Sequence, residues 1–585
     1  MENAPLRMFV YKNSKLLRDF IFYAMFMILL NVTLLYRRDI DQSYWLLYAA
    51  RHNVARNSFV FPVTETQPEI DDSGAFTGSY TSSTRYERLK FESIASADHT
   101  WKWLEGPVTR MFHENKTGYL NSGNTQIVGK IRLRQLRVKA NVGCYINNLA
   151  SQFIKDCFPP FQESSQSVDS YHDNQSPGFY WTQGSDLKGG GQAWSGTLGS
   201  YTPGGFVLDI DPNRKTFPKT IQALKRGLWI DHQTRLVELS YNVYNPNYNA
   251  YASAYYRIEF SNSGRVLSSY RVRAFTLDLC FFCDGFVVAE MALYLVFLFI
   301  VAIEFWELNF FSKIRRCVSL SVRSLWHVHH LLIFTFFFTS IISRFYTYGV
   351  AHAEIKRLWS PEMLQTFVDM NGYAYVYELG FAFESFVVFF ASLRMFKFLS
   401  TIDVMNQFTD VFLRASLEIL FFTFLFSATF FGFGVLAHNI YGASIGDFST
   451  LTLTIKTLLK MTVGLVDYES MRLTDPVWTP IFFTVYIVFV SMILVNVFLA
   501  ILNTSYTSIR EEKTAEDRRI KRLNAFRPET EKSTVDWKHG FIKIIWLPYA
   551  FNVQEMFLHP KEVHEQEQLK DKQLHDSTGG HVWQI

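Results

Sequence analysis

A short run of residues near the C-terminal end of the sequence has the types and spacing of a pore lining. Ser449 can begin a helix that extends from Thr450 to about Met461, and a non-helical run from Thr462 to Asp467 follows it. Carbonyl oxygens of such a run, repeated around a symmetry axis, can replace part of the hydration shell of a cation. The negative C-terminal end of the helix also favours cations. The sequence therefore predicts a pore loop, and a buried loop in a transporter or an enzyme is the alternative.

Two long apolar stretches flank this loop. They cover residues 415–436 and 480–502, and each can cross about 30 Å of hydrocarbon as a helix. Non-helical backbone survives at membrane depth only where protein buries it or where it lines water. Asp467 and Glu469 follow the loop and would form acidic rings at its outer mouth. The loop is therefore predicted to be re-entrant.

Four further apolar stretches bring the predicted number of membrane spans to six. They cover residues 20–36, 286–306, 325–342 and 379–399. Lysine and arginine are clustered before the first span, between the second and third, and after the sixth, so the positive-inside rule makes that side cytoplasmic. Arg37 and Arg38 oppose the rule locally, but long loops cross the membrane with little regard to charge.

The composition indicates a membrane protein with a large polar insertion. Hydrophobic residues make up 49% of the 585 residues and there are 56 Phe, yet the mean hydropathy is only +0.03. The formal net charge of +4 gives no reason to expect binding to nucleic acid. The sequence contains no nucleophile elbow, zinc-protease motif or nucleotide fingerprint, so we expect no enzymatic activity, no cofactor and no metal site. Cys280 and Cys283, and the histidines at 327, 329 and 330, are better explained by packing and interfacial anchoring.

The insertion, residues 37–285, is predicted to lie outside the cytoplasm. Alternating sequences such as Thr234 to Leu239 predict antiparallel strands, and short helical patches make the domain α+β. Cys144 and Cys157 form an even pair, which predicts a disulfide in an oxidising compartment, with two free thiols as the alternative. Asn115 begins an Asn-Lys-Thr glycosylation sequon.

Several motifs resemble those of the polycystins, in the polycystin-two branch of the TRP channel superfamily. In the insertion they are Trp101 to Gly106, Arg134 to Val138, the cysteine pair, Leu228 to Asp231 with Thr234 and Arg235, and Asn242 to Asn245; in the pore they are Asp447 to Thr450 and Asn496 to Asn503. They occur in the order of the family and extend over nearly the whole chain.

The resemblance implies a non-selective cation channel that passes Ca²⁺, Na⁺ and K⁺. It would be a homotetramer, or a heterotetramer with a polycystin-one-like subunit, and the insertion would be the polycystin domain that joins neighbouring subunits. Val463, Gly464 and Leu465 match the filter, and Leu499 and Asn503 match the lower gate. The family has an acid directly after the filter glycine, whereas this chain has Leu465, so weaker attraction for divalent ions is expected.

The fourth span carries Arg394 and Lys397 on one helical face, at the two basic positions of the family's fourth span. They are candidates for weak voltage sensing, and snorkelling to the cytoplasmic interface is the alternative. Glu290, Glu304 and Glu384 are possible counter-charges, which the sequence alone cannot pair.

The expected parts are thus a cytoplasmic N-terminus (1–19), the first span (20–36), the extracytosolic polycystin domain (37–285), a voltage-sensor-like bundle of spans two to four (286–399), a linker with the pore spans and loop (400–503), and a cytoplasmic tail (504–585). The tail begins as a helical extension of the sixth span whose basic cluster can meet anionic membrane lipids. The resemblance suggests a ciliary, flagellar or plasma membrane, with the endoplasmic reticulum as an alternative.

Two other functions are consistent with the sequence. Leu465 and the nearby cation Lys460 favour a modulatory, non-conducting subunit that needs a partner. The size of the insertion is the only feature that favours an adhesion or ligand-sensing protein anchored by its spans.

Overall fold

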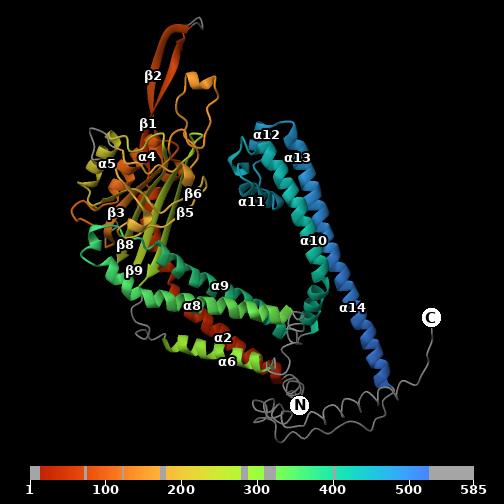
Figure 1. The fold of residues 1–585 in the computed structure, drawn as a ribbon. Helices are drawn as coiled ribbons and strands as arrows, with labels where there is room; N and C mark the ends of the chain where they lie inside the picture. Colours follow the sequence, from red (N-terminus) through yellow and green to blue (C-terminus); the bar gives the residue numbers. More distant parts are fainter. Residues whose placement is uncertain are drawn as a thin grey trace. The chain divides into compact units, whose positions relative to one another are not determined.

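The computed structural model describes residues 14–70, 76–121, 124–171, 179–277, 287–307, 325–399 and 403–525. The chain divides into two compact units. One is Met25–Phe390, and the other consists of Met1–Ala24 together with Ala391–Ile585. The first unit contains a β-rich domain and apolar helices that adjoin it, and the second contains the predicted pore (Figure 1).

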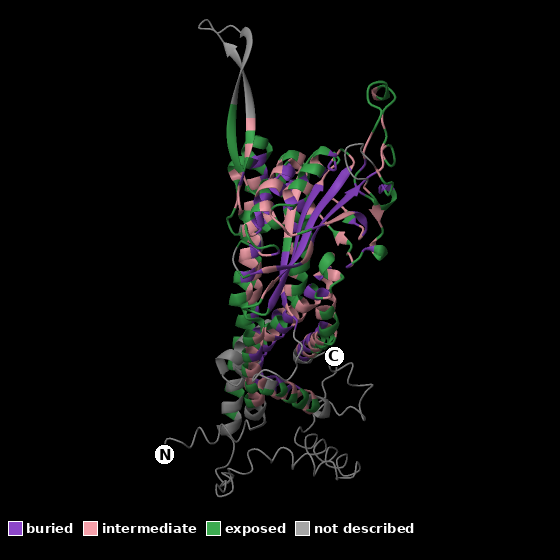
Figure 2. Cartoon of the chain, turned by 90° about the vertical axis from the view of Figure 1, so that its left-hand side faces the viewer, coloured by how far each residue is buried: buried purple, intermediate pink, exposed green. Residues whose placement is uncertain are grey.

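A six-stranded antiparallel sheet forms the centre of the β-rich domain, in the order β10-β9-β8-β3-β7-β4. Its strands are β3 (Gln126–Arg137), β4 (Trp181–Thr182), β7 (Gly205–Ile210), β8 (Thr234–Asn245), β9 (Ala250–Phe260) and β10 (Val266–Thr276). Strand β8 confirms the prediction made from the alternation of Thr234 to Leu239. However, β8 and β9 are buried along nearly their whole length, on both faces (Figure 2). Their polar residues therefore need partners inside the domain.

Buried ion pairs supply partners across the three central strands. Glu238 in β8 lies directly opposite Arg134 in β3 and Arg257 in β9. Its carboxylate accepts a hydrogen bond from Arg134 Nε at 3.0 Å and another from Arg257 Nε. Burial alone would raise the pKa of Glu238, but the two guanidinium groups outweigh burial and hold that pKa below its ordinary value. The Glu238 carboxylate thus pairs with both guanidinium groups across the three central strands.

Short helices cover one face of this sheet. They are α3 (Ile40–Arg51), α4 (Ala97–Trp103) and α5 (Phe217–Arg226). Trp103 is fully buried and its Nε1 donates to the Val54 carbonyl oxygen at 3.0 Å. The Tyr256 hydroxyl in β9 donates to the Ala50 carbonyl oxygen at 3.1 Å, so α3 is tied directly to the sheet. These contacts explain why the Trp101 to Gly106 motif belongs to the core.

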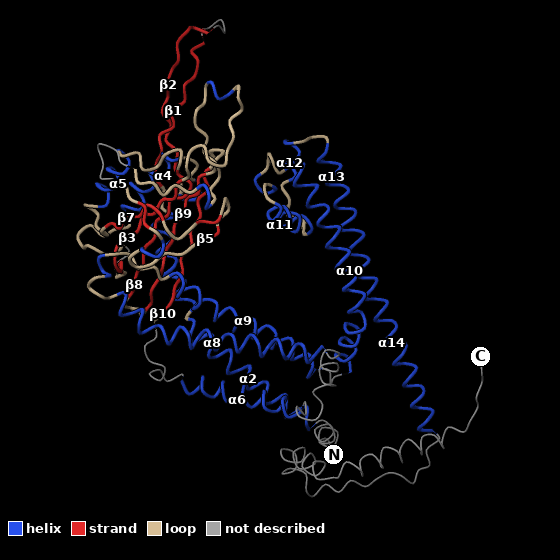
Figure 3. The backbone as a smooth tube through the Cα atoms, viewed as in Figure 1, coloured by secondary structure: helices blue, strands red, loops and turns tan. Residues whose placement is uncertain are grey.

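Two hairpins lie outside the sheet. β5 (Trp194–Ser195) pairs with β6 (Ser200–Tyr201), and β1 (Phe59–Ile70) pairs with the longer β2 (Phe76–Leu89). The β1–β2 ribbon extends away from the sheet, on the side opposite to the apolar helices of the same unit (Figure 3).

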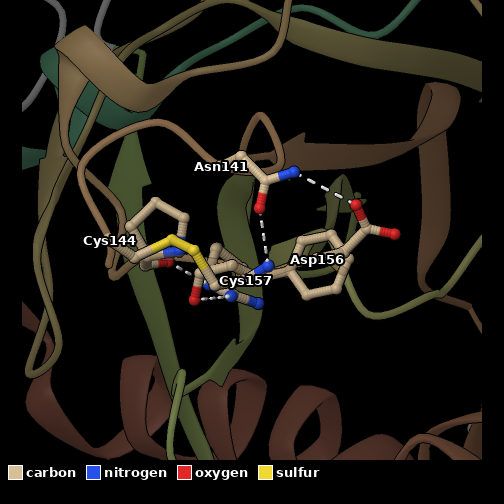
Figure 4. The surroundings of a disulfide bond; sticks show 7 residues. Asn141, Cys144, Asp156 and Cys157 are labelled. Carbon is tan, nitrogen blue, oxygen red and sulfur yellow. Dashed lines mark hydrogen bonds between the residues drawn. A yellow bond between two sulfur atoms is a disulfide. The ribbon is translucent and has the colours of Figure 1, made fainter. Parts of the chain in front are cut away.

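The predicted disulfide between Cys144 and Cys157 is present, with the two Cα atoms 6.2 Å apart. Asn141 holds the end of the loop, because its Oδ1 accepts the Cys157 N–H at 2.9 Å while its Nδ2 donates to Asp156 (Figure 4). The closed loop exposes large apolar side chains, including Phe153, which is 86% exposed. The disulfide therefore fixes an apolar projection rather than a buried core.

Four helices of the described residues are long and apolar enough to cross a membrane, over Phe20–Arg56, His329–Leu358, Asn371–Met395 and Glu418–Tyr441. Two shorter apolar helices, Val288–Ile303 and Trp478–Val490, lie where the second and sixth spans are predicted. In the first unit, aromatic rings hold α2 (Ser14–Arg38), α6 (Val287–Glu307) and α8 (Leu325–Leu358) together. Phe26, Phe297 and Phe337 form this contact, with ring centroids 4.4–6.2 Å apart.

The third and fourth apolar helices are longer than their predicted spans. Helix α8 continues to Leu358, and α9 (Asn371–Leu399) begins eight residues before the predicted start at 379. The reason is packing: Leu358, Met370 and Tyr373 join a cluster with Tyr251 and Phe275 of the sheet. These helix ends are therefore part of the β-rich domain's core.

The second unit is built around the predicted pore loop. Its helices are α10 (Asp403–Tyr441), α11 (Leu451–Thr462), α12 (Tyr468–Thr474), α13 (Trp478–Tyr486) and α14 (Val495–Ala525), with a π-helical segment at Ile487–Leu494. Tyr486 lies at the centre, where its hydroxyl donates to the Leu458 carbonyl oxygen at 2.7 Å and contacts the Thr462 hydroxyl at 2.8 Å. The C-terminal half of α11 is thus anchored to α13. The charged continuation of α14 to Ala525 confirms the predicted helical start of the tail.

Candidate pore and charged helix bundle

Helix α11 is the predicted pore helix, and its first turn differs from the prediction in one residue. Thr450, not Ser449, is the N-cap: its backbone is extended and its hydroxyl oxygen accepts the Leu453 N–H at 3.3 Å. The Ser449 hydroxyl instead donates to the Gly446 carbonyl oxygen at 2.7 Å, in the short turn before the helix. Serine and threonine are both common N-cap residues. Here the Ser449 hydroxyl is already bonded within the preceding turn, so Thr450 caps the helix.

The pore helix ends at Gly464 in a Schellman motif. Gly464 has φ +83°, and the N–H groups of Gly464 and Leu465 donate to the carbonyl oxygens of Met461 and Lys460 at 3.0 and 2.9 Å. A Cβ at Gly464 would meet nothing within 4 Å, so glycine is required by the backbone angle and not by space.

The predicted filter residues follow this turn. Val463 and Leu465 are 72% and 67% exposed. No donor in the described part of the chain reaches the carbonyl oxygens of Val463, Gly464 or Leu465. Three consecutive carbonyl groups are therefore available to a ligand, shortly after the Lys460 and Met461 carbonyls that accept the hydrogen bonds of the Schellman motif.

The two outer acids are engaged locally. Asp467 caps helix α12, since its carboxylate accepts both the backbone N–H and the hydroxyl of Ser470. These hydrogen bonds lower the pKa of Asp467 and keep it ionised. Glu469 forms an ion pair with Arg472 at 2.5 Å. Of the two, only Asp467 carries a charge that no adjacent cation balances among the residues described.

The two predicted gate residues lie on helix α14. Leu499 is 55% exposed, and Asn503 is one turn further along, so both side chains are on the same face of the helix. The π-helical segment Ile487–Leu494 directly precedes this part of α14. Such segments frequently occur at functional sites, since they shift the register of the residues that follow.

A cluster of charges joins four helices of the first unit. Glu290 of α6 contacts Arg344 of α8 at 2.6 Å and Arg37 of α2 at 3.6 Å. Glu384 of α9 contacts the same Arg37 nitrogen at 3.4 Å and accepts the Ser340 hydroxyl at 3.0 Å. The predicted counter-charges Glu290 and Glu384 are thus paired with arginines outside the fourth span.

Sequence reasoning did not identify Arg37 and Arg344 as members of this cluster. The sequence did contain an indication of this cluster, because Arg37 conflicts with the positive-inside rule. A cation at the outer end of a membrane span needs a carboxylate nearby. Choosing that carboxylate requires the packing of helices far apart in the chain.

The two voltage-sensing candidates lie near the C-terminal end of α9. Arg394 is buried, and its guanidinium carbon lies 5.0 Å from the centre of the Tyr23 ring. The side chains of Lys397 and Glu304 are outside the described set. Burial against an aromatic ring does not match the snorkelling alternative for Arg394, which would extend the guanidinium into solvent.

The connection between α8 and α9 docks into the β-rich domain. Arg132 of β3 pairs with Asp209 at 2.8 Å, and Asp209 accepts the Phe367 N–H at 3.2 Å. Gly189, at φ +79°, approaches Phe367 so closely that a Cβ would lie 1.7 Å from its carbonyl oxygen. Asn242 Nδ2 also donates to the Val368 carbonyl oxygen at 2.6 Å. The connection is therefore fixed to the sheet by its backbone.

The remaining predicted positions are peripheral. Asn115 is exposed in a turn, as glycosylation requires. Cys280 and Cys283 lie outside the described residues, and so does the side chain of His327. Within the described ranges, no group of histidine, cysteine and acidic residues is arranged to hold a metal ion.

Comparison with known proteins gives two family matches. The polycystin domain model matches residues 90–278, and the polycystin cation channel model matches residues 286–509. Polycystin-2-like protein 1 of Homo sapiens is 27% identical over 439 residues, which are 72% of this chain and 53% of that protein. Polycystin-2 of Danio rerio is 26% identical over 440 residues, covering 73% and 47%.

A more distant relative, polycystin-1-like protein 3 of Mus musculus, is 19% identical over 458 residues, or 74% of this chain and 20% of that protein. The chain spans about half the length of the first two relatives. The solved structure of PI3P- and calcium-bound full-length TRPY1 covers 50% of this chain with a TM-score of 0.29 and 15% identity, too low to indicate a common fold. The matched regions contain both the β-rich domain and the loop around Gly464, and they confirm the resemblance inferred from the motifs: the chain is a membrane protein of the polycystin family, a family of channels and not of enzymes.

Proposed function

We propose that this chain is the subunit of a tetrameric, non-selective cation channel whose filter is formed by Val463, Gly464 and Leu465. The observation that carries the proposal is the row of three carbonyl groups after the Schellman turn, which accept no hydrogen bond from the described residues. Four copies around an axis would give rings of oxygen ligands for a partly dehydrated cation. Leu499 and Asn503 on α14 would form the lower gate.

The charges around the loop favour monovalent ions. Leu465 supplies no carboxylate at the narrowest ring, and Arg472 balances Glu469. The Asp467 ring is then the main source of attraction for Ca²⁺, and it lies outside the filter. Na⁺ and K⁺ are therefore the principal permeant ions, and Ca²⁺ passes to the extent that Asp467 attracts it.

Exposed apolar surface supports assembly into an oligomer. Around the loop, Leu473, Val477 and Trp478 are exposed in the single chain, as is Phe153 in the disulfide-closed loop. Exposed apolar patches mark surfaces that contact another protein or the membrane. The partner is a second copy of this chain, or a polycystin-one-like subunit in a heterotetramer, and no nucleic acid or cofactor takes part.

The six-span arrangement follows from the same proposal. The four long apolar helices and the two shorter ones would all cross the membrane, with residues 37–285 outside the cytoplasm. The disulfide and the exposed sequon at Asn115 fit that side. A ciliary, flagellar or plasma membrane is the proposed location.

One observation favours a second function, that of a modulatory subunit which does not conduct alone. Lys460 is exposed in the last turn of the pore helix, and its own carbonyl accepts the N–H groups of Val463 and Leu465. A ring of four ammonium groups this close to the filter would repel cations.

Patch-clamp recording of the chain expressed alone separates these functions. The channel proposal expects a current whose reversal potential follows the external Na⁺ and K⁺ concentrations and which Gly464→Ala abolishes. Gly432→Ala is the matched control, because Gly432 is a helical glycine of α10 whose added Cβ would also meet nothing within 4 Å. Absence of current, with tetramers present at the cell surface, would support the modulatory subunit.

A further inference from the structure

The β1–β2 ribbon is the one described sheet of the domain that neither family match covers. It spans Phe59 to Leu89, whereas the polycystin domain match begins at residue 90. Within the described residues β2 pairs with β1 alone, so both long edges of the ribbon lack a partner strand. A two-stranded ribbon is marginally stable in water by itself, and an unpaired edge is a template for another strand.

Proline distinguishes the two edges. Pro62 and Pro68 of β1 are six residues apart, so both occupy the same alternate set of positions. Proline has no N–H to give to the ladder and is accommodated where its nitrogen faces the outer edge. The outer edge of β1 therefore lacks two donors and is blocked.

The opposite edge is open. The residues paired with the prolines are Tyr86 and Tyr80, and the same alternate set of β2 includes Thr84 and Arg88. In an antiparallel pair, these positions direct both backbone N–H and C=O groups away from β1. None of them is proline, so the outer edge of β2 can accept a complete additional strand.

The charges of β2 identify its partner. Arg85 and Glu87 are both exposed and flank Tyr86, which is 69% exposed. If two copies of β2 pair antiparallel about a two-fold axis at Tyr86, then Arg85 of one copy lies opposite Glu87 of the other, and the reverse pair forms as well. The same register places Thr84 opposite Arg88 and brings no like charges face to face.

We propose that the outer edge of β2 is a homotypic docking site, at which two copies of this chain join their ribbons into a four-stranded antiparallel sheet with Tyr86 on the two-fold axis. Neighbouring two-fold registers fit less well: centring on Arg88 sets two arginines against each other, and centring on Thr84 leaves the charges opposite neutral residues. The ribbon extends away from the apolar helices of its unit (Figure 3). Residues 84–88 of β2 are all exposed in the single chain, so another strand can reach this edge.

Cysteine cross-linking on the full-length chain in membranes tests the register. Tyr86→Cys is expected to give a covalent dimer of the chain on a non-reducing gel after mild oxidation, because residues on a two-fold axis meet their own copies. Val60→Cys is the matched control, since Val60 is exposed on the same ribbon but belongs to the blocked β1 edge. It should give no more dimer than the unmodified chain.

Charge reversal in the Tyr86→Cys background tests the partner. Arg85→Glu or Glu87→Arg alone turns two opposite-charge pairs into two like-charge pairs, which should lower the cross-linked fraction about fivefold or more. The double change Arg85→Glu with Glu87→Arg restores both pairs and should restore the dimer. A lack of covalent dimer in well-folded Tyr86→Cys protein at the cell surface, cross-linking to a protein of another mass, or no recovery in the double variant would overturn the proposal. The readout is independent of ion current.

Discussion

Arg37 in helix α2 and Glu384 in helix α9 are 347 residues apart in sequence, yet Arg37 Nη1 lies 3.4 Å from the Glu384 carboxylate. The same arginine contacts Glu290, which is itself paired with Arg344. Two acids and two arginines thus balance one another among four apolar helices. This pairing offsets part of the desolvation free energy of placing charges among apolar helices.

The Arg37–Glu384 contact predicts a strong pairwise coupling. Glu384→Gln and Arg37→Gln should each lower the melting temperature of the detergent-purified chain, and the double variant should lose less than the sum, with a coupling of about 1–3 kcal/mol. Arg38→Gln is the control, because Arg38 is exposed and its guanidinium carbon lies 5.8 Å from the centre of the Phe381 ring. Strictly additive losses would show that the pair contributes nothing as a pair.

The buried triad of Arg134, Glu238 and Arg257 predicts acid sensitivity. The pKa of Glu238 is lowered in the folded chain, so its contribution is complete above the unfolded pKa of about 4.3 and is lost as the pH falls through the lower folded pKa. Glu238→Gln should cost about 3–5 kcal/mol at pH 7 and should flatten the dependence of unfolding on pH below about 4.

Tryptophan fluorescence during thermal unfolding, recorded across pH, measures both effects. The control is Glu114→Gln, which removes a surface ion pair with Arg214 and should cost about 0–1 kcal/mol. Equal losses for the two variants would contradict the buried role of Glu238.

Alanine substitutions at two glycines with similar positive φ angles test how closely the α8–α9 connection packs against the β-rich domain. Gly189 has φ +79° and Gly264 has φ +86°, but only Gly189 has a neighbour, the Phe367 carbonyl, in the space of a Cβ. Gly264→Ala should cost about 1–2 kcal/mol from backbone strain alone. Gly189→Ala should cost more and should increase hydrogen exchange of the backbone amides around Phe367. Similar exchange in both variants would argue against close docking.

A substitution in the disulfide-closed loop is expected to impair assembly of the tetramer without destabilising the fold. Phe153→Ser removes an exposed apolar side chain, so the free energy of unfolding should stay within about 0.5 kcal/mol, whereas the tetramer fraction in native mass measurements should fall. Tyr180→Ser changes another exposed ring, 70% exposed on the same domain, and should leave assembly unchanged. A loss of tetramer in both variants, or in neither, would remove the loop from the interface.

The features that sequence predicted well are local ones. The pore helix, the strand at Thr234 and the disulfide each depend on a few adjacent residues or on a single spacing. The motifs also identified the family.

The features that sequence could not supply depend on distant packing. Arg37 pairs with Glu384 because α2 packs beside α9. Helix α8 extends to Leu358 because Leu358 packs against Tyr251 and Phe275 of the sheet. The cap at Thr450 shows the limit of local reasoning too, since the turn before the helix competes for Ser449.

The most direct test of the central claim is the relative permeability to Ca²⁺ and Na⁺ of the chain expressed alone, compared with Asp467→Asn. The account predicts a cation current through the Val463–Gly464–Leu465 filter, whose low Ca²⁺ permeability falls further in Asp467→Asn while Na⁺ conduction persists. A relative Ca²⁺ permeability that is unchanged in Asp467→Asn, or no current from tetramers at the cell surface, would contradict the assignment of this loop as the conducting pore.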